Sequence, residues 1–141
     1  MAATAATPAT FPTEMNLGGT ALKAAGLVAA DAQTTAVFVG KGKFRVVTTI
    51  SAIEIASNDE IYIIDLEANT GAVIGTWFTL ATLFTGGATE KISKPDSVVG
   101  TYVTVVENPY DYQVRVATSV LGTIATGINF TVDIYPVESN A

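Results

Sequence analysis

The 141-residue sequence contains no cysteine and no histidine. Without cysteine the chain forms no disulfide and offers no thiolate to a metal ion, which leaves the redox compartment open. Without histidine it lacks the commonest general base and the commonest metal ligand. Ser-His and Cys-His nucleophile pairs and histidine-bound zinc are therefore excluded. We expect no enzymatic activity, no metal and no cofactor.

Charged residues are also scarce, at 14% of the chain, against roughly 25% in an average soluble domain. Seven bases and thirteen acids give a net charge of −6. Because phosphate binding needs clustered Lys and Arg, nucleic acid is disfavoured as a partner. A surface so poor in charge favours partial coverage by a partner protein, although uncharged polar surfaces also occur on stable monomers.

Long apolar runs are missing as well. Residues 21–30, ALKAAGLVAA, are too short and too rich in small side chains for a membrane span. The first twelve residues, MAATAATPATFP, lack the positive and apolar regions of a secretory signal. We therefore expect a soluble protein that is not exported by the general route and does not bind a membrane.

What the chain does contain is a series of short β-branched and aromatic runs separated by turn residues. Residues 128–135, INFTVDIY, alternate cleanly, so every second side chain from Ile128 to Ile134 is predicted to face inward. Comparable runs occupy 35–39, 44–66, 76–84, 101–107 and 112–120. About seven to eight strands in one domain predict an all-β fold, an antiparallel β-sandwich of jelly-roll type.

Residues 44–66, FRVVTTISAIEIASNDEIYIIDL, form the longest strand-like stretch. The turn-forming residues Ser57-Asn58-Asp59 between two apolar runs predict a hairpin. The apolar positions of the first run change parity, from Phe44, Val46 and Ile50 to Ile53 and Ile55. Because side chains alternate along a strand, we expect a bulge or bend near Ser51-Ala52.

Residues 1–16 are rich in Ala, Thr and Pro and are predicted to be a flexible N-terminal arm that precedes a single domain over 17–141. The arm is either a disordered tail or a segment that becomes ordered against a neighbouring subunit. In the second case Phe11 is a candidate partner contact. Residues 16–32, rich in Gly and Ala, are assigned to a loop.

Lys41, Lys43 and Arg45 form the one basic cluster. The surrounding GKGKF (40–44) is not a phosphate-binding loop, since it lacks the required spacing and leads into a strand. Two interpretations remain open. The cluster protects an edge strand from unwanted pairing, or it contacts an acidic partner surface.

Four acids, Asp59, Glu60, Asp65 and Glu67, gather around the central stretch. Paired carboxylates could act as a glycosidase acid and base or bind a hard cation. The spacing of a calcium-binding loop is missing, and acids commonly occupy turns. We interpret these residues as solvated turn positions.

The aromatic residues divide into two groups. Trp77 and Phe78 have apolar neighbours and are predicted to fill the core. Tyr110 and Tyr112, which flank Asp111 after a turn, are predicted to make exposed partner contacts. A sugar-binding platform built on these tyrosines is an alternative.

Two stretches carry a family resemblance. SAIEIASNDEIYIIDL (51–66) resembles the central hairpin of the capsid cement, or decoration, proteins of tailed bacteriophages. YQVRVATSVLGTIATGINFTVDI (112–134) resembles the end of the same proteins, most specifically in GTIATGINF (122–130). TLATL (79–83) is similar to a third, weaker block that lies between them in the same order.

The resemblance implies a jelly-roll-like fold, a homodimer or homotrimer, and binding to the major capsid protein. It places the protein in the virion, on the outer surface of an icosahedral capsid, where it would stabilise the joints between capsid subunits. A carbohydrate-binding β-sandwich module on a virion or cell surface is the alternative function.

Overall fold

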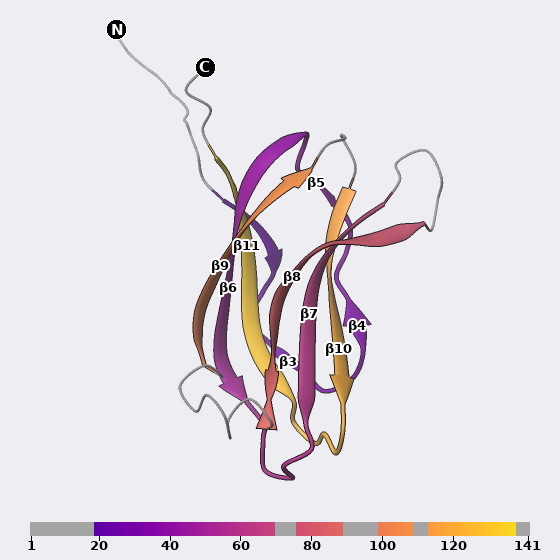
Figure 1. Cartoon of the computed structure of the whole chain (residues 1–141), viewed down its shortest axis with the longest axis vertical. Coiled ribbons are helices and arrows are strands. Elements are labelled where there is room, and N and C mark those ends of the chain that lie inside the picture. The colour runs from indigo at the N-terminus through magenta and orange to yellow at the C-terminus, as the bar shows by residue number, and fades with distance from the viewer. Residues whose placement is uncertain (1–18, 70–75, 89–98, 109–112, 138–141) are drawn as a thin grey trace, which may run out of the picture.

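The computed structural model describes residues 19–69, 76–88, 99–108 and 113–137, which form ten strands (Figure 1). The strands are β2 (Thr20–Lys23), β3 (Leu27–Val28), β4 (Ala32–Gln33), β5 (Val37–Phe38), β6 (Gly42–Ile53), β7 (Ile61–Asn69), β8 (Trp77–Gly87), β9 (Gly100–Asn108), β10 (Gln113–Leu121) and β11 (Ile128–Pro136). No helix in the described ranges is long and apolar enough to cross a bilayer.

Two antiparallel sheets pack against each other as a sandwich. One has the order β4-β10-β7-β8, with β5 also pairing β10, and lies on the right in Figure 1. The other has the order β2-β11-β6-β9, with β3 also pairing β11, and lies on the left. Strands β2 and β3 both pair β11, and β4 and β5 both pair β10. Each of these two pairs fills one position in its sheet, so the ten strands occupy eight positions, which we call rows.

These rows pair in a nested order. The first row, β2 with β3, pairs the last, β11, and the second, β4 with β5, pairs β10. The third, β6, pairs β9, and the fourth, β7, pairs β8. This nesting is the jelly-roll arrangement, which confirms the predicted fold class. The structure has more strands than the seven to eight expected because the first two rows are each broken into short pieces.

The core lies between the inner faces of the two sheets. Along β11, Ile128, Phe130, Val132 and Ile134 are buried, as the alternation predicts, while the residues between them are partly exposed. Opposite them, Tyr62, Ile64 and Leu66 of β7 are fully buried. Each such apolar side chain contributes about 1.5–3 kcal/mol of burial free energy.

The predicted irregularity of β6 is a β-bulge at Ser51. Phe130 pairs Ile50, whereas the preceding Asn129 pairs Ala52, so Ser51 is the extra residue. Its hydroxyl donates a hydrogen bond to the carbonyl oxygen of Asn129 at 3.2 Å. The bulge changes the facing of the residues after it, which explains the change of parity in the sequence.

The predicted hairpin across Ser57-Asn58-Asp59 is wrong. Strands β6 and β7 belong to different sheets, so the segment between them is a crossover from one sheet to the other. Asn58 adopts a left-handed conformation at φ 64° there, which Asn tolerates better than most residues. Turn chemistry was correctly predicted, but it does not specify which sheet the next strand joins.

Strand β8 contains two further irregularities, because its pairing with β7 shifts between Ile64 and Asp65 and again between Leu66 and Glu67. Leu80 and Leu83 are consequently extra residues, and both parities of β8 approach the core. The prediction that Trp77 and Phe78 fill the core is wrong, because neither belongs to the core cluster or packs against it. Trp77 is only half-buried, and 39% of Phe78 remains exposed.

The loop assignment for residues 16–32 is also wrong in part. This region supplies β2, β3 and the start of β4, which are only two to four residues long. Within its described part, residues 19–32, Leu22 is the one residue in the buried core cluster. Short strands with so few inward apolar residues show no alternation that a sequence pattern can detect.

Candidate functional site

The three basic residues of the predicted cluster, Lys41, Lys43 and Arg45, lie together at one end of the β2-β11-β6-β9 sheet. Lys43 and Arg45 occupy alternate positions of β6 and point to its outer face, and Lys41 lies in the bend just before the strand. All three are exposed. Strand β6 lies between β11 and β9, so the interpretation of these residues as guards of an edge strand is wrong.

Neighbouring strands add apolar, aromatic and acidic groups to this cluster. Arg45 pairs Val105 of β9 on one side and Tyr135 of β11 on the other. Its guanidinium carbon lies 5.3 Å from the centre of the Tyr135 ring, a cation–π contact of about 0.5–1 kcal/mol at an exposed site. Lys43 pairs Glu107, which gives this cation a carboxylate neighbour.

Exposed valines continue the same surface along β9. Val103 and Val105 are 56% and 61% exposed, and Val103 pairs the half-buried Val47 of β6. We call this surface the β6–β9 face; it comprises Lys43, Arg45, Val47, Val103, Val105, Glu107 and Tyr135. Its mixture of cations, an aromatic ring and aliphatic side chains suits contact with a protein surface that is partly apolar and partly acidic.

A second group of functional residues lies at the opposite end of the sandwich, where the β6–β7 and β10–β11 connections run side by side (Figure 1). Glu54 Oε1 accepts hydrogen bonds from the backbone amides of Ala125, Thr126 and Gly127 at 2.9, 2.7 and 2.8 Å. The Thr126 hydroxyl donates a fourth at 3.2 Å. One carboxylate therefore satisfies three consecutive amides of the other connection.

Two neighbouring acids extend this arrangement. Asp59 accepts hydrogen bonds from the amide and the hydroxyl of Thr123 at 3.0 and 2.9 Å. Glu60 is fully buried and accepts from the amides of Ser57 and Asp59 at 2.8 and 3.2 Å. The interpretation as a solvated turn residue is wrong for Glu60, which is buried. It is confirmed for Asp59, which is exposed in the turn, although its carboxylate also binds Thr123 of the other connection. We call Glu54 and Asp59 the carboxylate clamps.

The clamps have consequences for acid–base chemistry. Amide hydrogen bonds from residues 125–127 lower the pKa of Glu54, and those from Thr123 lower the pKa of Asp59. A glycosidase general acid needs a raised pKa, so neither carboxylate is suited to donate a proton. The Tyr62 hydroxyl donates to the Glu54 carbonyl oxygen at 2.8 Å, and burial raises the pKa of Tyr62 to about 12.

The two remaining acids lie on the outer face of β7. Glu67 Oε1 accepts a hydrogen bond from Arg115 Nε at 2.8 Å, and the Arg115 guanidinium carbon stacks 4.0 Å from the Trp77 ring centre. Asp65 is half-buried. Among the described residues, no group of three or more acids gathers as a potential metal site.

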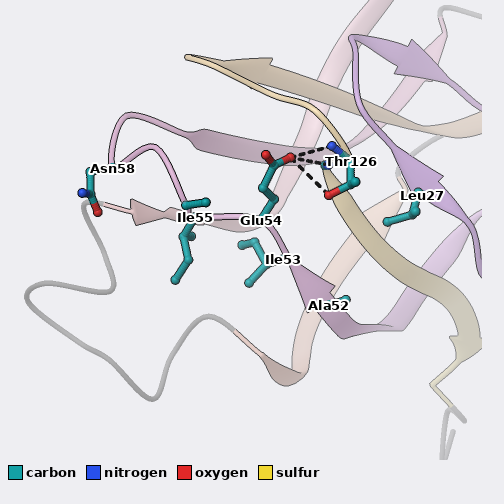
Figure 2. Close-up of a pocket in the computed structure, with 9 residues that line it drawn as sticks. Leu27, Ala52, Ile53, Glu54, Ile55, Asn58 and Thr126 are labelled. Carbon is teal, nitrogen blue, oxygen red and sulfur yellow. Dashed lines mark hydrogen bonds between the residues drawn. The ribbon is translucent and has the colours of Figure 1, made fainter.

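An open depression of about 460 Å³ is lined in part by Glu54, the first of the carboxylate clamps. Figure 2 shows Glu54 reaching to Thr126, with Leu27, Ile53 and Ile55 around it. Leu27 is 58% exposed, and both isoleucines are half-buried. Since the clamp oxygen of Glu54 is already occupied, the depression suits an apolar side chain better than a charged ligand.

Three predicted contact residues, Phe11, Tyr110 and Tyr112, lie outside the described residues. Sequence reasoning missed Tyr135, Val103 and Val105 as surface residues. Apolar side chains occur at both parities of TYVTVVE (101–107), so the pattern does not tell which side faces solvent. Glu54 was missed because nothing local distinguishes it from a solvated strand residue.

Comparison with known proteins adds no family: neither a protein-family model nor a curated protein sequence matches the chain.

Proposed function

We propose that the chain is a structural cement protein of a tailed bacteriophage. It binds the outer surface of the icosahedral capsid as a homo-oligomer and stabilises the joints between major capsid subunits. In this role the chain needs no catalysis, cofactor, nucleic acid or membrane, and it resides in the virion after synthesis in the host cytoplasm.

One observation supports the proposal most directly. The two long stretches that resemble cement proteins, 51–66 and 112–134, contact each other in the folded chain. Glu54 and Asp59 of the first stretch accept hydrogen bonds from residues 123 and 125–127 of the second. The resemblance thus falls on one connected structural unit and not on scattered positions. A sandwich whose connections are tied in this way suits a protein that transmits load between capsid subunits.

The β6–β9 face is our candidate for the capsid contact. It combines two exposed cations with exposed valines on a chain of net charge −6, so it can attract an acidic patch that the rest of the molecule would repel. Many symmetry-related copies, each making a modest contact, can bind a shell with high avidity. Weak individual contacts are therefore compatible with a stabilising role.

Co-sedimentation with capsids of the virus that encodes the chain tests the proposal. Wild-type protein should sediment with the capsids, and capsids carrying it should resist heating better than bare ones. Lys43→Gln with Arg45→Gln should reduce bound protein at least several-fold. The matched control, Gln33→Glu with Thr85→Glu, makes the same change in net charge on exposed positions of β4 and β8 and should bind normally. Absence of wild-type binding would refute the proposal.

The alternative, a carbohydrate-binding module, has one observation in its favour. Phe38 is 67% exposed and pairs Gln113, the residue after Tyr112. An exposed aromatic ring offers an apolar surface on which the face of a sugar ring could stack. Glycan-array binding that is lost in Phe38→Ala or Tyr112→Ala would favour this function, and a blank array would remove it.

A further inference from the structure

The two sheets of the sandwich have four edges, and three of them are protected by devices that prevent pairing with another chain. The edges formed by β2 with β3 and by β4 with β5 consist of strands of only two to four residues. The edge strand β8 is interrupted by two register shifts. Short strands and bulges both make an edge a poor template for pairing.

The fourth edge has none of these devices. Strand β9 runs for nine residues along the left margin of Figure 1 and pairs β6 over its whole length without a register shift. Its sequence, GTYVTVVEN, has high β-propensity, contains no Pro or Lys and carries one charge, that of Glu107. Among the described residues β9 pairs no strand on its other side.

From this contrast we infer that β9 is an interface, and that its partner is β9 of a second copy of the chain. The two strands pair antiparallel about a two-fold axis, which joins two β2-β11-β6-β9 sheets into one. This inference names the surface for the homo-oligomer of the proposed function, but it concerns the free protein and does not depend on capsid binding.

The side chains of β9 favour one register of this pair. Opposed residues of antiparallel strands share a face, so the outward residues of one copy must oppose outward residues of the other. Centring the axis on Thr104 places Val103 of each copy opposite Val105 of the second copy. The same register places Glu107 opposite Thr101, which avoids contact between like charges.

The pattern is therefore self-complementary, as an isologous interface requires. The two exposed valines on each copy lie side by side with the two valines of the other. The β6–β9 faces of both copies become one continuous outer surface, with the cations Lys43 and Arg45 repeated on either side of the axis.

Measuring the mass of the full chain in solution over a range of concentrations is the first test. Wild-type protein should form a dimer, and Val103→Lys with Val105→Lys should be monomeric because lysine on an edge opposes pairing. A matched control places two lysines at other exposed apolar positions, Phe38 and Leu121, and should remain dimeric. Circular dichroism should show that both variants are folded.

Disulfide trapping tests the register, since the native chain has no cysteine. Directly opposed residues of antiparallel strands lie about 4.5–5.5 Å apart between Cα atoms, which is compatible with a disulfide. Mixing Val103→Cys with a size-tagged Val105→Cys and oxidising should give the mixed dimer in high yield. Either variant alone should crosslink poorly, because its cysteines are diagonal neighbours about 7–8 Å apart.

Three outcomes would overturn the inference. One is a wild-type chain that stays monomeric at every concentration, and another is a dimer or trimer that the β9 lysines leave intact. The third is a monomeric chain whose β9 lysines abolish only capsid binding, since this would assign the edge to a strand of the capsid protein. A variant that cannot dimerise but still binds capsids would show that the proposed function does not depend on the β9 dimer. Failure of the inference is thereby distinguished from failure of the proposed function.

Discussion

At the scale of single residues, the carboxylate clamps join two connections by hydrogen bonds, whereas apolar packing holds the rest of the sandwich together. Glu54 and Asp59 replace water as hydrogen-bond acceptors for amides that are 64 to 73 residues away along the chain. Hydrogen bonds to a charged acceptor are among the stronger ones in proteins. The stability of this end of the sandwich is therefore coupled to the ionisation of two side chains.

Acid should weaken the protein through these clamps. Since their folded-state pKa values are lowered, both groups bind protons more weakly when folded than when unfolded. Their contribution is complete above the ordinary values of 4.5 and 3.8, and it is lost as the pH falls through the lowered values.

Urea unfolding at a series of pH values measures this effect. The double variant Glu54→Gln with Asp59→Asn should have a lower urea midpoint than wild type at neutral pH. Its midpoint should also fall less steeply below about pH 4. If the urea midpoints of the two proteins fall equally steeply with decreasing pH, the clamps are not the source of acid sensitivity.

Two glycines with nearly the same backbone conformation provide a second prediction. Gly40 and Gly127 have φ values of 86° and 89°, but a Cβ at Gly40 would meet nothing within 4 Å, whereas one at Gly127 would overlap the Val28 carbonyl. Gly40→Ala should cost about 1–2 kcal/mol of unfolding free energy, from the left-handed conformation alone. Gly127→Ala should cost at least about 2 kcal/mol more, from the overlap.

Chemical denaturation of both variants measures this difference. Equal losses of stability would mean that the close approach of Gly127 to β3 is unimportant.

Little of this residue-scale detail could be predicted from the sequence. A carboxylate such as Asp59 looks the same in the sequence whether it is solvated or bound to amides. Its partner Thr123 is 64 positions away, and only the packing of the two connections brings them together.

At the scale of elements, the bulge in β6 explains how one strand serves both ends of the core. Ser51 is the extra residue, and without it Ile53 and Glu54 would each point to the opposite face. The bulge thereby places Ile53 against the core cluster and allows Glu54 to reach the β10–β11 connection.

Deleting Ser51 should therefore be far more damaging than replacing it. Ser51→Ala loses one exposed hydrogen bond to Asn129 and should cost about 1 kcal/mol or less. Deletion shifts the register of the strand end, breaks the Glu54 clamp and should prevent a cooperative unfolding transition or lower its midpoint strongly. A deletion variant as stable as Ser51→Ala would contradict this role of the bulge.

The elements themselves were largely predictable, because β11 and β10 carry clean alternation and β6 carries a visible change of parity. The way in which the strands connect into two sheets was less predictable. The residues of the Ser57-Asn58-Asp59 turn suit a hairpin and a crossover equally well. In β8 the extra residues Leu80 and Leu83 erased the period that would have identified its inner face.

At the scale of the whole molecule, three of the five cations in the described ranges, Lys41, Lys43 and Arg45, lie at one end of one sheet, in a chain of net charge −6. Capsid binding through the β6–β9 face should therefore weaken as salt is added, since the screening length falls from about 10 Å at 0.1 M to about 3 Å at 1 M. Lys43→Gln with Arg45→Gln should bind more weakly and respond less to salt. Equal salt dependence in both proteins would place the contact elsewhere.

The all-β fold class could be predicted at this scale because it depends on the number and spacing of alternating segments and not on any single contact. The β6–β9 face could not be predicted, because its residues Lys43, Val105 and Tyr135 come from three separate strands. Only the pairing of β6 with both β9 and β11 makes them neighbours.

The nested strand order also constrains how the protein is made. As the chain leaves the ribosome, β7 and β8 can pair at once, but β6 must wait for β9, and the first strands must wait for β11. Phe130 and its buried neighbours on β11 follow all the other described strands in the sequence. Even after β9 has paired, a nascent chain therefore exposes the other edge of β6 and an unfilled interior until β11 emerges. Premature termination before Ile128 would release a chain prone to aggregation.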